Sequence, residues 1–366
     1  MLKNVLRFIK GIKIDTPLFL GLLVLIGVGL LNLYSSSGQD MSMFLGQLRN
    51  VAFALTFMLI LAQLPPDFYC RWSLPAYAGC VLLLILVWKF GTVNMGAKRW
   101  LDLGIVKFQP SEFLKVIMPI AVAAFITKRS IPIRFSYVIL AFLVVLIPTG
   151  LIVIQPDLGT AVLVAFSGSV VIFLAGMSKL LICLIGGIAG CYIPIHWKFF
   201  MHDYQRQRIL TFMDPESDPL GSGYHIIQSK IAIGSGGLFG KGWLNGTQTQ
   251  LEFLPERHTD FAYAVFAEEF GLVGFVLLMA MYLYVLFRSA YISSHASTTF
   301  GKLLGGAITV TFFIYIFINI GMVSGLLPVV GVPLPLISFG GTSMVSICAG
   351  FGILMSIQTH KEEKLF

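Results

Sequence analysis

Four charged residues in this sequence have the types and the spacing that proton transfer beside an anionic ligand would need. Glu112 and Lys115 are close enough in sequence that a helix would present them on one face. Asp157 and Asp260 each lie just before a long apolar run, where a carboxylate would sit at a membrane surface. A carboxylate placed among cations can act as a general base for a hydroxyl group.

Cations accumulate near the same segments. Lys98 and Arg99 precede Trp100, and the topology expected from the apolar runs places them on the outer side together with Arg49. Lys and Arg normally concentrate on the cytoplasmic side. Outer cations of this kind favour a phosphate-bearing ligand, which ammonium and guanidinium groups bind well. The pattern therefore predicts a site for a phosphorylated lipid that is chemically altered at the outer surface.

The acids and their partner lysine also have structural explanations. Asp157 and Asp260 suit helix N-caps, because an Asp side chain accepts hydrogen bonds from the free N–H groups there and the helix dipole favours its charge. Glu112 and Lys115 could form a structural ion pair at a helix start. These readings are compatible with chemistry, and the sequence leaves them open.

Two more charged groups have alternatives of the same kind. Lys98 and Arg99, next to a tryptophan, could anchor the chain in the headgroup region. Glu268 and Glu269 lie inside an apolar run, where paired acids are unusual. A contact to another helix or to a partner explains them at least as well as a chemical role.

The composition shows what kind of protein must position these residues. Of 366 residues, 57% are hydrophobic and 11% are charged, and the mean hydropathy is +0.87. Soluble domains carry about 25% charged residues, and disordered chains combine low hydrophobicity with high net charge, so both classes are excluded. A β-barrel would show short alternating segments. We expect an all-α polytopic membrane protein, with residues 1–366 forming one integral membrane domain.

Apolar runs of spanning length recur along the chain and predict about ten transmembrane helices. They lie at residues 17–35, 48–64, 74–90, 112–127, 135–154, 159–177, 178–195, 262–287, 303–324 and 340–358. The long polar stretch 196–261 separates the seventh run from the eighth and predicts a large extracytoplasmic loop. A connection of this length is uncommon between packed helices unless it is functional.

The N-terminal cations set the expected orientation. They are Lys3, Arg7, Lys10 and Lys13. By the positive-inside rule they place residues 1–16 in the cytoplasm. An even number of spans returns residues 359–366 to the cytoplasm and brings all the candidate site residues to the outer side, at one depth.

Three further features carry structural expectations. The Pro- and Gly-rich residues 328–343 predict a broken segment before the last span, either lining a cavity or forming an ordinary re-entrant turn. The five cysteines lie in or beside apolar runs and are expected to be packing residues. Residues 224–233 would lie along the membrane interface, with these side chains toward lipid: Ile226, Ile227, Ile231 and Ile233.

A series of long motifs, in order along nearly the whole chain, resembles the SEDS family (shape, elongation, division, sporulation), and within it the RodA branch rather than the FtsW branch. The motifs are KRWLDLG (98–104), FQPSEFLK (108–115), QPDLGT (155–160), HDYQRQR (202–208), DPESDPLGSGYHIIQSKIAIGSGG (214–237), LEFLPERHTDF (251–261) and PLPLISFGGTS (333–343).

The resemblance implies a peptidoglycan glycosyltransferase of cell elongation. Such an enzyme polymerises lipid II into β-1,4 glycan strands at the outer face of the bacterial cytoplasmic (inner) membrane. The implied partners are a class B penicillin-binding protein, which is a transpeptidase, and other membrane proteins of the elongation complex. Nucleic acid has no role. No cofactor is identified, and whether a divalent cation assists the reaction is left open.

The resemblance also implies roles for individual residues. The essential aspartate of the family maps onto Asp260, the expected general base on the 4-hydroxyl of the incoming lipid II. Arg99 and Lys115 would hold the pyrophosphate of the leaving group, and Glu112 would orient Lys115 or the acceptor. Further candidates for substrate binding are Asp157, Lys98 and Arg49.

Two other functions remain compatible with the sequence. Many spans with buried charges and broken helices also fit a transporter that flips lipid II, although the charged residues in or near the spans cluster on the outer side. A non-catalytic scaffold that recruits a cell-wall synthase would leave polymerisation intact after an Asp260→Asn change.

Overall fold

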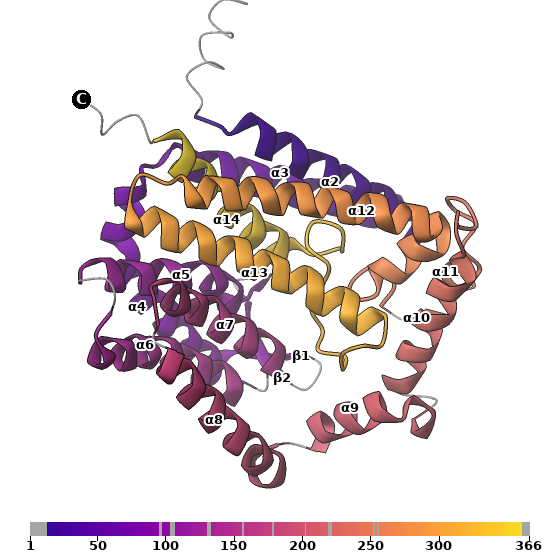
Figure 1. Cartoon of the computed structure of the whole chain (residues 1–366). Coiled ribbons are helices and arrows are strands. Elements are labelled where there is room, and N and C mark those ends of the chain that lie inside the picture. Colours follow the sequence, from indigo (N-terminus) through magenta and orange to yellow (C-terminus); the bar gives the residue numbers. More distant parts are fainter. Residues whose placement is uncertain are drawn as a thin grey trace, which may run out of the picture.

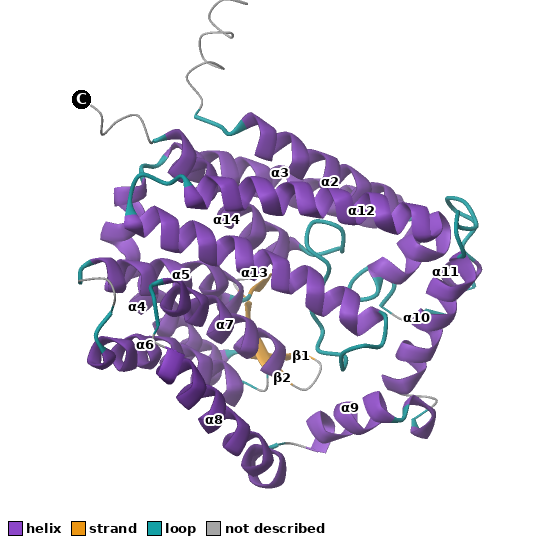
Figure 2. Cartoon of the chain, viewed as in Figure 1, coloured by secondary structure: helices purple, strands orange, loops and turns teal. Residues whose placement is uncertain are grey.

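The computed structural model describes residues 13–94, 97–102, 107–129, 133–155, 157–177, 179–201, 203–218, 222–251, 253–254 and 256–360. Helices make up most of this part of the chain (Figure 2). Within it, nine helices are long and apolar enough to cross a membrane, and α7 is a shorter apolar helix of 17 residues. The prediction of an all-α polytopic membrane protein with about ten transmembrane helices is confirmed.

Each predicted apolar run corresponds to one helix, with small differences at the ends. The helices are α2 (Thr16–Ser36), α3 (Met41–Gln63), α4 (Pro66–Phe90), α5 (Pro110–Thr127), α6 (Phe135–Ile154), α7 (Leu158–Leu174), α8 (Lys179–Ile195), α12 (Ala262–Ser294), α13 (Thr299–Val323) and α14 (Gly341–Thr359). The agreement has a simple cause, because a helix that spans a bilayer needs about 20 apolar residues whatever its neighbours are.

The helices pack in two layers (Figure 1). One layer follows the order α2, α12, α13, α7 and α6, and the other follows α3, α14, α5 and α4. Helix α13 lies at the centre and contacts α12, α7, α5 and α14. Helix α8 lies at the edge of the bundle, and most of its described side chains are exposed. The charged side chains of Glu112 and Lys115 on α5, and the polar residues Tyr315 and Asn319 on α13, are therefore enclosed by protein.

A small antiparallel sheet, which the sequence does not predict, connects α4 to α5. Its strands are β1 (Thr92–Asn94), β2 (Ala97–Asp102) and β3 (Lys107–Phe108), in that order across the sheet. Leu101 pairs with Phe108. Strand β2 carries residues 98–102 of the KRWLDLG motif, and β3 leads into Pro110, the first residue of α5.

The long connection between α8 and α12 is largely helical. It contains the π-helix η1 (His196–Phe200), α9 (Asp203–Met213), the 3-10 helix η2 (Pro215–Ser217), α10 (Ser222–Gly236) and α11 (Thr247–Gln250). The prediction that α10 turns its isoleucines toward lipid is wrong for Ile226, which is 1% exposed, although Ile231 is exposed. Helix α10 packs against α12, and this contact buries one of its faces.

Helix α12 is bent at Gly271, so the predicted single span is interrupted. Gly271 has φ 63° and ψ −160°, a conformation available almost only to glycine. The ring centroids of Tyr263 and Phe275 are 5.9 Å apart, whereas a straight helix would separate these residues by roughly 18 Å along its axis. We refer to residues 262–270 as the short arm and to residues 272–294 as the long arm.

The segment between α13 and α14 is re-entrant. A Cβ added at Gly29, well inside α2, would lie 2.3 Å from the carbonyl oxygen of Leu336. The hydroxyl of Tyr282, in the middle of the long arm, donates to the carbonyl of Pro335 at 2.6 Å. The broken segment predicted before the last span is therefore confirmed, and it returns to the interior of the helix bundle.

Candidate functional site

The two predicted residues of α5 form a buried ion pair between the layers. Lys115 Nζ lies 2.5 Å from Glu112 Oε1, and both side chains are less than a tenth exposed. Pro110 starts the helix, which places Glu112 in its first turn and Lys115 one turn later on the same face. The hydroxyl of Ser346, on α14, lies 3.5 Å from Glu112 Oε2, the outer limit of a hydrogen bond.

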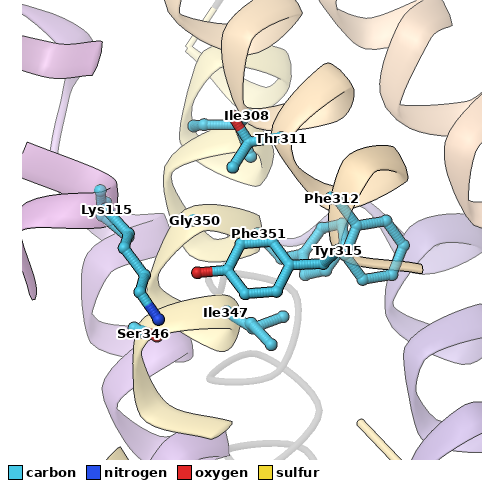
Figure 3. Close-up of a pocket in the computed structure, with 10 residues that line it drawn as sticks. Lys115, Ile308, Thr311, Phe312, Tyr315, Ser346, Ile347, Gly350 and Phe351 are labelled. Carbon is cyan, nitrogen blue, oxygen red and sulfur yellow. The ribbon is translucent and has the colours of Figure 1, made fainter. Parts of the chain in front are cut away.

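Lys115 faces a small cavity lined by α5, α13 and α14 (Figure 3). The cavity has a volume of about 40 Å³, enough for water but far too small for a sugar. Lys115 Nζ lies 5.2 Å from the ring centroid of Tyr315, within the range of a cation–π contact. Ile308, Phe312 and Phe351 contribute apolar side chains to its lining. The ammonium group is thus held between a carboxylate and an aromatic ring.

Asp157 caps helix α7, as the structural reading of the sequence predicts. Its Oδ1 accepts a hydrogen bond from the backbone N–H of Thr160 at 3.3 Å. Its Oδ2 accepts from Gln109 Nε2 at 3.2 Å, and Gln109 is the N-cap residue of α5. Asp157 therefore joins the start of α7 to the start of α5. Gln109, its partner on α5, precedes Glu112 by three residues.

Asp260 lies between the short arm and the re-entrant segment. Its backbone carbonyl accepts a hydrogen bond from Asn319 Nδ2 at 2.9 Å. A Cβ added at Gly331 would lie 3.4 Å from Asp260 Oδ2, so the carboxylate faces the backbone of the re-entrant segment. The N-cap of α12 is Phe261, with no side-chain cap. The alternative prediction, that Asp260 caps this helix, is therefore wrong.

One stretch of the re-entrant segment links these groups. A Cβ added at Gly159, in the first turn of α7, would lie 2.7 Å from the carbonyl oxygen of Val330. Val332 packs with Tyr315 and Leu163 in a small apolar cluster. The backbone around residues 330–332 thus contacts the surroundings of Asp260, of the Asp157 cap and of Tyr315, the ring beside Lys115.

Three of the predicted substrate-binding cations are not placed in this group. The structure describes the backbone of Lys98 and Arg99 in β2, whereas their side chains lie outside the described residues. Arg49 is exposed on α3, which contacts α14 and α2. Its guanidinium lies near Gly46 of the same helix.

Sequence reasoning missed three residues around the site. Tyr315, Asn319 and Ser346 are uncharged and lie inside apolar runs, where nothing in the local pattern distinguishes them from packing residues. Tyr315 and Asn319 are four apart on α13, so they share one face. That spacing of polar groups in a spanning helix is the one signal that could have identified them.

A second carboxylate–lysine pair, with a buried glutamate and a partly exposed lysine, lies at the bend of α12. Glu268 Oε1 accepts from Lys241 Nζ at 2.8 Å and from the backbone N–H of Gln248 at 3.0 Å. The hydroxyls of Thr247 and Thr249 donate to its two oxygens, each at 3.2 Å. Glu268 therefore ties the connection before α12 to the short arm. The adjacent Glu269 accepts from the Ser35 hydroxyl of α2.

Two histidines lie beside the stretch that carries Asp260. The His225 ring, on α10, stacks on Phe261 with centroids 5.6 Å apart. Burial lowers the pKa of His225 below its usual range, and the nearby charge of Glu256 opposes this shift. His258 packs edge-on against Phe339, whose backbone N–H donates to the His258 carbonyl. Both rings pack against the backbone next to the acid.

Among the described residues, no cluster of three or more His, Cys, Asp or Glu side chains could hold a metal ion.

The fold and site define a class: a multi-pass membrane protein with an enclosed acid–base group at the start of several spans. A family model described as "Cell cycle protein", FTSW_RODA_SPOVE, matches residues 12–363. The chain belongs to this FtsW/RodA/SpoVE family, and the resemblance to the SEDS family is thereby confirmed.

Curated relatives resemble the chain over nearly its full length. It is 51% identical to the peptidoglycan glycosyltransferase MrdB of Escherichia coli (strain K12) over 359 residues, which cover 98% of this chain and 97% of MrdB. It is 32% identical to the probable peptidoglycan glycosyltransferase FtsW of Pseudomonas fluorescens (strain SBW25), covering 97% of this chain and 90% of that protein. The higher identity to MrdB agrees with the predicted branch.

Solved structures share the fold. The rod shape determining protein RodA of Thermus thermophilus matches with a TM-score of 0.73 and 28% identity, over 96% of this chain and 99% of that one. A chain in a structure described as "Structural coordination of polymerization and crosslinking by a peptidoglycan synthase complex" matches with a TM-score of 0.83 and 30% identity, with the same coverage.

Proposed function

We propose that this chain is a peptidoglycan glycosyltransferase that polymerises lipid II during cell elongation. The observation that carries the proposal is the position of Asp260 against the re-entrant segment. One face of α13 contacts both Asp260, through Asn319, and the buried Lys115, through Tyr315. Activity names of relatives that cover almost the whole chain support the reaction class.

In the proposed reaction, Asp260 is the general base. Its carboxylate takes the proton from the 4-hydroxyl of the terminal GlcNAc of an incoming lipid II. The oxygen forms a bond to C1 of the lipid-linked MurNAc at the end of the growing strand, and the bond from C1 to the phosphate oxygen breaks. Undecaprenyl pyrophosphate leaves with the bonding electron pair. Inversion at C1 converts the α-linked donor to a β-1,4 linkage.

Lys115 stabilises the charge that grows on the departing pyrophosphate, and Arg99 assists it. Glu112 holds Lys115 at a fixed position, since a buried lysine has few other acceptors. Asp157 fixes the joined starts of α5 and α7 around the donor. Lys98 and Arg49 add positive charge for the same anion. The roles of Lys115, Glu112 and Asp157 rest on the contacts described above and on the family's motif positions. Those of Lys98 and Arg99 rest on motif positions alone, and that of Arg49 on its expected place on the outer side.

The proposal also includes the cellular location of the protein and its partners. The protein lies in the bacterial cytoplasmic membrane, with Asp260 and residues 196–261 on the periplasmic side and both termini in the cytoplasm. Its partner is a class B penicillin-binding protein, which cross-links the new strands within an elongation complex. The similarity to a chain from a complex of polymerization and crosslinking supports this partner.

A direct test uses the purified protein, with and without the partner, and labelled lipid II. The wild type yields glycan strands, and Asp260→Asn, which keeps the size of the side chain and removes the base, yields none. Equal product from both proteins would reject Asp260 as the base and leave the scaffold reading. Movement of lipid II across vesicles without glycan product would favour a transporter.

A further inference from the structure

Helix α13 contributes a buried polar residue whose contacts converge on Asp260. Asn319 is fully buried, and its Nδ2 donates to two backbone carbonyls: that of Asp260 at 2.9 Å and that of Val332 at 2.7 Å. Its Oδ1 has no hydrogen-bond partner in the described part of the chain. The amide is thus oriented by its donor side, since the reversed orientation would set an oxygen against two carbonyl oxygens.

The two acceptors of Asn319 belong to the two segments that meet at the Asp260 carboxylate. One is the carbonyl of Asp260 itself. The other belongs to Val332, the residue after Gly331, whose backbone the carboxylate faces. Asn319 therefore joins the backbone at Asp260 to the backbone at Val332 and so sets the distance between the acid and the re-entrant segment. The N-cap Phe261 offers no side-chain bond that could do the same.

The same helix face reaches the cation of the site. Tyr315 precedes Asn319 by four residues, one helical turn or about 6 Å along the axis. Its ring lies against Lys115, and it packs with Val332. A rigid helix that contacts the acid with one residue and the cation with another fixes the spacing between them. A misplacement of 1 Å between reacting groups can lower a rate about 100-fold.

We infer that Asn319 is a positioning residue that holds Asp260 at its working distance from the re-entrant segment and from Lys115. The inference rests on the proposed function, because it assumes that Asp260 is the base. It adds a residue that acts through Asp260 and does not contact the substrate. Its loss should lower turnover and leave the binding of lipid II nearly unchanged.

The experiment compares Asn319→Leu and Asn319→Ala with a matched control. Asn319→Leu keeps the approximate size of the side chain and removes both donor hydrogens without adding a charge, and Asn319→Ala removes the side chain beyond Cβ. Ser229→Ala is the control: this buried hydroxyl contacts the carbonyls of Ile226 and Val323, both at 2.9 Å, and Val323 ends the same helix. Each variant is measured for kcat on labelled lipid II, for lipid II affinity and for thermal unfolding.

Both Asn319 variants should lose about 10- to 100-fold in kcat, with lipid II affinity within about twofold of wild type, while Ser229→Ala keeps its kcat. If the Asn319 variants lose no more kcat per folded molecule than Ser229→Ala, or if affinity falls as much as kcat, the inference is wrong. An active Asp260→Asn variant would instead overturn the proposed function, so the two failures are distinguishable. Asn319→Leu, which adds no charge and leaves no large cavity, decides the question if Asn319→Ala does not fold.

Discussion

Two carboxylate–lysine pairs in this protein each contain a buried carboxylate, and they differ in their surroundings. Glu112 and Lys115 lie on one helix, 2.5 Å apart, and within the described part of the chain the remaining carboxylate oxygen contacts only the distant hydroxyl of Ser346. Glu268 and Lys241 are 2.8 Å apart and come from different segments. Three further donors complete the coordination of Glu268.

The difference indicates that the Glu112 carboxylate is available for chemistry, whereas the Glu268 carboxylate has a structural role. Each oxygen of Glu268 accepts a hydrogen bond from the connection before α12, so this carboxylate has little capacity left for a ligand. Glu112 keeps acceptor capacity, and its lysine borders a cavity. An incompletely satisfied buried pair is expensive for folding, and such groups are typical of functional sites.

The largest effect is expected at Lys115. Lys115→Met keeps the apolar stem and removes the charge, and it should lower polymerisation about 100-fold or more through the lost stabilisation of the pyrophosphate. It should also lower the free energy of unfolding by about 3–5 kcal/mol, because Glu112 is left buried without its partner. Glycan synthesis per folded molecule and thermal unfolding measure the two effects.

A double variant separates the two effects of Lys115. Glu112→Gln with Lys115→Met removes both charges and should recover much of the stability, while glycan synthesis stays absent. Recovery of synthesis together with stability would show that this pair is as structural as the pair at Glu268, and the contrast would fail.

The next effect concerns the bend that Glu268 supports. Gly271→Ala adds a Cβ that would lie 2.3 Å from the backbone nitrogen of Gly240, in a conformation that non-glycine residues rarely adopt. It should lower the free energy of unfolding by more than about 2 kcal/mol. Gly27→Ala, on α2 with open space around it, is the control and should change stability little. Comparable thermal unfolding of both variants would show that the bend is not held by this contact.

The smallest effect is expected at Glu268 itself. Glu268→Gln keeps the shape and one acceptor, so Lys241, Thr247 and Thr249 lose only part of their bonding, and stability should fall by about 1–3 kcal/mol. Polymerisation per folded molecule should stay within about twofold of wild type, as checked by assaying a purified, monodisperse fraction. A loss of activity far beyond the loss of folded protein would move Glu268 into the catalytic group.

The sequence predicts the membrane spans well because the hydrophobic thickness of a bilayer fixes their length. It also predicts the cap at Asp157, which depends on local backbone geometry alone. The sequence does not predict the break at Gly271, because the apolar run continues through that glycine and the bend depends on contacts with residues 236–242.

The charged residues of the candidate site could be predicted from the sequence, whereas its uncharged residues could not. Glu112 and Lys115 stand out as charges in an apolar chain, and their spacing gives the pairing. Tyr315 and Asn319 acquire their roles only when α13 packs between α5 and the re-entrant segment. Asp260 resembles an N-cap in sequence, yet the helix starts one residue later and the carboxylate faces the backbone at Gly331.

Four helices begin around this site: α5 after Gln109, α7 after Asp157, the short arm of α12 after Asp260, and α14 just before Ser346. The first two meet through the Gln109–Asp157 hydrogen bond, and Ser346 contacts the Glu112 carboxylate. The amino end of a helix carries about half a positive elementary charge from its aligned peptides. The aligned peptides at these helix starts therefore add positive partial charge beside the carboxylates of Glu112, Asp157 and Asp260. Under the proposed function, this backbone charge adds to that of Lys115 in stabilising the departing phosphate group.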